Sequence, residues 1–155
     1  MKIRNILIIA LFLMFTIACS HYEELTVNSI DSKSGDDESH NPGQDCGSCH
    51  NKTGSEAASE GWWTVAGTVF KTNGSAQKSA TIELWTKPGK QGTMVKRLVT
   101  DDLGNFYTDQ ILNFQGGVYP VIITASDEKR MSSAFSGGSC NSCHNGSTQA
   151  KLTIN

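Results

Sequence analysis

Trp62-Trp63-Thr64-Val65-Ala66-Gly67-Thr68-Val69-Phe70 is the stretch of this sequence that decides the fold. Trp63, Val65, Gly67 and Val69 alternate with the residues between them, a two-residue period that is typical of a β-strand. A turn signal, Asn-Gly, follows at 73–74. The stretch therefore predicts a strand with one face directed at a core.

Similar short segments recur along the chain between Gly-rich turns. We expect further strands at 80–85, 95–99, 106–108, 118–125 and 151–155. The segment 118–125 is apolar on both faces, which is typical of a central strand. No segment has a convincing apolar period of 3.6 residues. These features predict an all-β domain at 45–155, a small antiparallel β-sandwich.

Three segments carry a resemblance to a known family. They are 66–70, 79–84 and the Thr-Asp-x-x-Gly-x-Phe turn at 100–106. Together they resemble the carboxypeptidase regulatory-like family over about residues 64–125. The resemblance implies a transthyretin-like or immunoglobulin-like sandwich without an activity of its own. On such a scaffold the function must come from groups added to it.

The N-terminus has the features of an export signal. Lys2 and Arg4 precede an apolar run at 6–18, which is too short to span a bilayer comfortably. We expect residues 1–18 to be a signal peptide. Cleavage near Ala18 for ordinary secretion, or an uncleaved anchor, are the alternatives.

The residues after this run resemble the bacterial lipoprotein signal. The resemblance implies cleavage before Cys19 and lipidation of that cysteine, which would anchor the exported chain to a membrane. The serine directly after this cysteine, Ser20, resembles one sorting rule of bacterial lipoproteins. That resemblance implies a place at the outer membrane or cell surface. Residues 19–44 are polar and poor in large aliphatic side chains, so we expect a flexible tether.

Charge excludes one class of function. The chain has 13 basic and 15 acidic residues and no basic patch. Nucleic-acid binding is therefore not expected.

The cysteines give the sharpest prediction. Four of the five form two Cys-x-x-Cys-His motifs: Cys46, Cys49 and His50, then Cys140, Cys143 and His144. The two-residue spacing lets both thiols reach the two vinyl groups of one porphyrin, and the adjoining histidine can then bind the iron from below. This motif is typical of c-type haem attachment, with the histidine as an axial ligand. We expect two covalent haem c groups, one in an N-terminal segment and one in a late loop.

Three other uses of these cysteines remain open. The pairs could form disulfides, because an exported chain meets an oxidising compartment. Both pairs together could form a Cys₄ zinc site. Thioredoxin-like exchange is the third, although no βαβ pattern surrounds either motif.

The distal ligands are less strongly indicated than the proximal ones. His40 precedes the first motif closely and is the candidate for the first haem. Met131 lies shortly before the second motif and is the candidate for the second haem. His21, Met94 or a partner subunit are alternatives, and Met131 could simply pack.

We therefore expect a lipid-anchored dihaem c-type cytochrome that transfers electrons in the bacterial envelope or at the cell surface. Its partners would be redox proteins, including multihaem cytochromes. The sequence has no evident catalytic constellation, so an enzyme is not expected. Trp62, Trp63 and Phe135 would pack on haem faces or in the core. The alternative is a surface sandwich with disulfide-bonded pairs that binds carbohydrate or protein through Trp62, Trp63 and Trp85.

Overall fold

The computed structural model describes residues 29–52, 54 and 61–155. The expected signal peptide, Cys19, His21 and the start of the expected tether lie outside these residues. In the described part of the chain, no helix is both long and apolar enough to cross a membrane.

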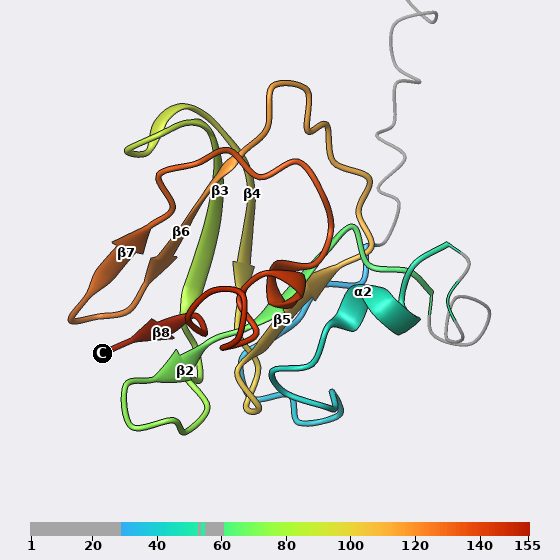
Figure 1. Cartoon of the computed structure of the whole chain (residues 1–155), viewed down its shortest axis with the longest axis vertical. Helices are drawn as coiled ribbons and strands as arrows, with labels where there is room; N and C mark the ends of the chain where they lie inside the picture. The colour runs from blue at the N-terminus through green and yellow to red at the C-terminus, as the bar shows by residue number, and fades with distance from the viewer. Residues whose placement is uncertain (1–28, 53, 55–60) are drawn as a thin grey trace, which may run out of the picture.

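The described residues form two layers of short strands (Figure 1). One layer is an antiparallel sheet in the order β4-β3-β6-β7, with bounds Gln91–Val99, Thr81–Lys87, Tyr119–Ile123 and Glu128–Arg130. The other layer contains two strand pairs. β1 (Val65–Thr68) and β5 (Asn105–Thr108) are antiparallel, whereas β2 (Phe70–Lys71) and β8 (Thr153–Ile154) are parallel. The expected small, mainly antiparallel all-β sandwich is confirmed.

The core lies between these layers. Ile82 and Leu84 on β3 are 1% exposed and meet Val65 and Phe106 from β1 and β5 in one apolar cluster. Gly67 lies opposite Phe106 in the register of β1 and β5. A Cβ atom at Gly67 would lie 2.6 Å from the Phe106 ring, so glycine makes room for this core aromatic.

Most of the expected strands are present. The opening stretch forms β1 and β2, and the segment at 118–125 provides β6 between β3 and β7, a central position. β7 was not expected, because its residues Glu128–Arg130 are all exposed and have no apolar alternation. The short helices of the described residues, α2 (Cys46–Cys49) and η1 (Cys140–Ser142), were not expected either.

The described part of the expected tether, 29–44, lies against the sandwich. Ser32 is 5% exposed; its backbone N–H donates to the Tyr107 carbonyl at 3.0 Å, and its hydroxyl donates to the Val99 carbonyl at 2.7 Å. Lys96 pairs with Asp31 at 2.6 Å. The segment is held by hydrogen bonds and charge, which a composition poor in apolar residues does not reveal.

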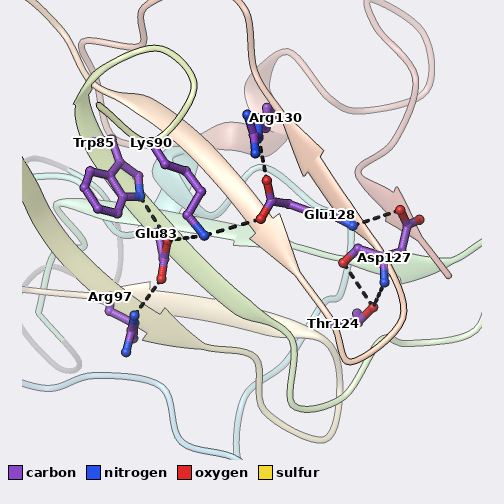
Figure 2. Close-up of polar contacts among 8 residues, drawn as sticks. All are labelled: Glu83, Trp85, Lys90, Arg97, Thr124, Asp127, Glu128 and Arg130. Atoms are coloured by element: carbon purple, nitrogen blue, oxygen red, sulfur yellow. Dashed lines mark hydrogen bonds and ion pairs between the residues drawn. The ribbon is translucent and has the colours of Figure 1, made fainter. Parts of the chain in front are cut away.

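A polar cluster lies on β3 and its neighbours (Figure 2). The Glu83 side chain is 4% exposed and accepts hydrogen bonds from Arg97 at 2.7 Å and from the Trp85 indole at 2.9 Å. Lys90 lies 3.3 Å from both Glu83 and Glu128. Burial alone would raise the pKa of Glu83, but the hydrogen bonds from Arg97, Trp85 and Lys90 outweigh it and lower the pKa.

Glu83→Gln is expected to weaken the acid dependence of stability. The folded-state pKa of Glu83 lies below its unfolded value of about 4.3. The carboxylate therefore stabilises the fold above that value, and the contribution is lost as the pH falls through the folded-state pKa. Urea unfolding at pH 7 should show a loss of about 1–2 kcal/mol in the variant. The difference between variant and parent should shrink below pH 4; an unchanged difference would contradict the ion pairs.

Candidate functional site

The two Cys-x-x-Cys-His motifs adopt the same backbone turn. The backbone N–H of His50 donates to the Cys46 carbonyl at 2.8 Å, and that of His144 donates to the Cys140 carbonyl at 2.9 Å. The first turn is the helix α2 and the second is the 3₁₀ turn η1. In both motifs this hydrogen bond joins the backbone of the histidine to that of the first cysteine, one turn earlier.

The side chains around the motifs repeat as well. The hydroxyls of Ser48 and Ser142 each donate to the carbonyl three residues earlier, at 2.7 Å in both motifs. The amides of Asn51 and Asn145 donate to the carbonyls of these serines, at 3.4 Å and 3.2 Å. The sequence repeat Cys-x-Ser-Cys-His-Asn is thus a structural repeat.

Each motif histidine presents the same ring nitrogen to a backbone carbonyl. His50 Nδ1 lies 3.3 Å from the Gly61 carbonyl oxygen, and His144 Nδ1 lies 2.9 Å from that of Ala150. A carbonyl oxygen can only accept, so each of these contacts is a hydrogen bond when Nδ1 carries the proton. This is the tautomer in which Nε2 binds a metal, with the carbonyl fixing the orientation of the ring.

The first motif opens on a cavity of about 580 Å³. His40, Cys46, Cys49 and His50 all line it, as does Trp63. The ring centroids of His40 and His50 are 5.7 Å apart, and the Trp63 ring lies 5.1 Å from that of His50 with a tilt of 34°. The structure therefore brings together the histidine of the first motif and its expected distal partner.

The second motif opens on a separate cavity of about 290 Å³. Its lining includes Cys140, His144 and Met131, together with Phe106 and Ile122 from the core. The expected distal ligand thus shares a cavity with the second histidine. Cys143 lies at the surface beside this site.

The two motifs are in direct contact. The Gly47 N–H lies 3.4 Å from the Ser139 hydroxyl, and a Cβ atom at Gly47 would lie 2.9 Å from Ser139 Cβ. The Asn141 amide, from the second motif, donates to the Gln44 carbonyl before the first motif at 2.7 Å. Segments about a hundred residues apart in the chain therefore bring the two motifs into contact.

Two buried asparagines that sequence reasoning missed hold this site together. Asn141 is 1% exposed, and its amide also donates to the Thr68 hydroxyl of β1 at 3.0 Å. Asn105 on β5 is 4% exposed, accepts from the same hydroxyl at 2.6 Å and donates to the His40 carbonyl at 3.1 Å. Asn105 thereby fixes the backbone of the candidate distal ligand. Asn141 stands inside the second motif and Asn105 in the turn at 100–106, but the sequence does not reveal the partners of either side chain.

The remaining residues singled out in the sequence are three tryptophans, Phe135 and Met94. Trp62 receives a cation–π contact from Lys52 at 5.1 Å, and Phe135 packs against the core and Phe114. Met94 is exposed on β4. Trp85 belongs to the Glu83 cluster, whereas Trp63 is stacked between His50 and Tyr107. Trp63 and Trp85 thus take part in separate contacts.

The four motif cysteines are free thiols with different environments. Cys140 belongs to the apolar core, and burial, with smaller contributions from Cys46 and Cys143, raises the pKa of its thiol to about 12. Burial also raises the pKa of Cys46, against an opposing backbone hydrogen bond. Cys49 and Cys143 are exposed. Among the described residues, no group of three or more His, Cys, Asp or Glu side chains is arranged to hold a metal ion.

In the haem-free chain, alkylation is expected to follow these environments. The thiolate is the nucleophile, and at pH 8 a thiol of pKa about 12 is ionised in only about one molecule in ten thousand. Iodoacetamide should therefore label Cys49 and Cys143 first, Cys46 more slowly and Cys140 last. Peptide mass spectrometry over time measures the order. Unfolding in urea should make the four rates similar, and early labelling of Cys140 in the folded chain would contradict its burial.

No protein-family model, curated protein or solved structure matches the chain.

Proposed function

We propose that this chain is a dihaem c-type cytochrome, an exported and lipid-anchored electron carrier. The observation that carries the proposal is the duplicated motif geometry. Twice, a cysteine pair stands next to a histidine whose Nδ1 is held by a carbonyl and whose ring lines a cavity. Disulfide formation asks nothing of these histidines, whereas haem attachment uses both the cysteine pair and the histidine of each motif.

The donor atoms of both sites suit an iron porphyrin. Cys46, Cys49, His50 and His40 would hold the first haem. The ring centroids of the two imidazoles are 5.7 Å apart, and both rings line the first cavity. The volume of the first cavity is in the range of small-molecule sites, and the apolar face of Trp63 lines it.

The second site offers Cys140, His144 and Met131 in the cavity lining, with Cys143 exposed at the surface. These four residues would hold the second haem. Its cavity is near the lower limit of volume for a small-molecule site, so part of the group would face solvent. Phe106 and Ile122 supply apolar contacts.

The bound haem would supply a one-electron couple, and the protein sets its ligands, burial and surrounding charge. The contacts of Asn105 and Asn141 hold the segments that carry these ligands, so that little would have to move when the charge of the site changes. Lipidation at Cys19 would keep the carrier at a membrane, near redox partner proteins that include multihaem cytochromes. We propose transfer of electrons alone, without turnover of a substrate.

The test is to express the full chain for export together with the haem-maturation machinery. We expect a red protein whose reduced spectrum has a sharp α-band. Two haems per chain should survive denaturation, because thioether bonds are covalent. The mass of the denatured chain gives their number. A colourless product with four free or disulfide-bonded cysteines would overturn the proposal.

A further inference from the structure

The two sites differ in the ligand that would complete each iron. His40 faces His50 in the first cavity, whereas Met131 shares the second cavity with His144. A His/Met pair raises the reduction potential of a haem relative to two histidines. The ligands alone therefore favour an electron on the second site.

The charges around the first site act in the same direction. Glu38 and Asp45 line its cavity. Tyr107, also in the lining, reports this acidic field: burial raises the pKa of its phenol, and the nearby carboxylates of Asp36, Asp101 and Glu38 raise it further. Negative charge stabilises the oxidised iron, which carries one more positive charge than the reduced iron.

The second site has the opposite surroundings. Lys129, Arg130 and Lys151 line its cavity. Arg130 is paired with Glu128, whereas Lys151 lies over the Phe70 ring at 4.9 Å. Positive charge disfavours the oxidised iron and raises the potential.

The motifs that carry the two sites touch through Gly47 and Ser139, and Asn141 connects them to a common strand, β1.

We propose, on the basis of the function proposed above, that the sites are a directional pair: the acidic His40–His50 site is the low-potential donor and the basic Met131–His144 site is the high-potential acceptor. One electron passes from the first site to the second. The first is oxidised and the second reduced, with no bond formed or broken.

The experiment is a spectroscopic redox titration of the full haem-loaded chain. We expect two one-electron steps, with electrons favouring the second site at least tenfold, which corresponds to about 59 mV. Met131→His should lower the upper potential and remove the thioether-to-iron absorption of the ferric protein, and it should leave the lower potential nearly unchanged. His40→Met should raise the lower potential.

Charge variants separate the electrostatic effect from the ligand effect. Reversing Lys129 and Lys151 to Glu should lower the upper potential, and Glu38→Lys should raise the lower one. Lys87→Glu, at the exposed end of β3, is the matched control and should shift neither. Two haems with equal potentials, or an upper step that responds to His40→Met, would overturn the direction and leave the haem assignment standing. A chain without haem would overturn the proposed function itself.

Discussion

A chain carrying Cys46→Ala and Cys49→Ala is expected to bind one haem instead of two and to keep its fold. Both thioether bonds of the first haem would be lost, while the second motif would be intact. Cys46 is half-buried and Cys49 is exposed, and neither belongs to the apolar core. The mass of the denatured chain should fall by the mass of one haem, and the circular dichroism of the sandwich should be unchanged.

The matched variant is Cys140→Ala with Cys143→Ala. It is also expected to lose one haem, but it should cost stability as well, because Cys140 packs in the core at 9% exposure. Removing a buried sulfur atom costs about 1 kcal/mol. Retention of two covalent haems by either double variant would contradict the assignment of the motifs. Equal stability of the two variants would contradict the core position of Cys140.

This difference between the two motifs could not be predicted from the sequence, where they are nearly identical. The sequence does predict haem attachment, because the two cysteines and the histidine of each motif stand close together in the chain. Burial of Cys140 depends on β1, which lies beside η1: the Ala66 N–H donates to the Gly138 carbonyl at 2.9 Å. Such a contact between distant segments leaves no periodic signal in either of them.

The strands that were predictable are those with an apolar pattern. β1 and β3 place Val65 and Ile82 in the interior, and a two-residue period follows from that burial. β6 was predicted from a run that is apolar on both faces. β7 forms because its backbone pairs with β6, from Val121–Arg130 to Ile123–Glu128 in register. Its exposed side chains contribute no such pattern.

The candidate distal ligands also combine a feature that is local in the sequence with a contact between distant segments. His40 and Met131 each stand shortly before a motif in the sequence, and each lines the cavity of that motif. Short loops limit where a side chain can lie, so nearness in sequence favours nearness in the fold. Asn105 lies on β5 and its amide donates to the His40 carbonyl. This contact between distant segments was not predictable from the sequence.

Gly67→Ala is expected to lower the free energy of unfolding by about 1–3 kcal/mol, the usual cost of overpacking a core. The added Cβ would lie 2.6 Å from Phe106 Cζ and 2.9 Å from Cys140 Cβ, and both neighbours are buried. The backbone at Gly67 has no positive φ, so the cost arises from the contact and not from the backbone conformation. Urea or thermal unfolding of the haem-free chain measures it.

Gly137→Ala is the matched control, because nothing lies within 4 Å of a Cβ atom there and its φ is also not positive. Both substitutions restrict the unfolded chain equally, which favours the folded state by about 0.4–1 kcal/mol. The control should therefore be neutral or slightly stabilised, and the difference between the variants isolates the clash. Gly67→Ala should also speed alkylation of Cys140, since that side chain must move away. If the two variants were equally stable and Cys140 equally protected, β1 would not pack against the second motif.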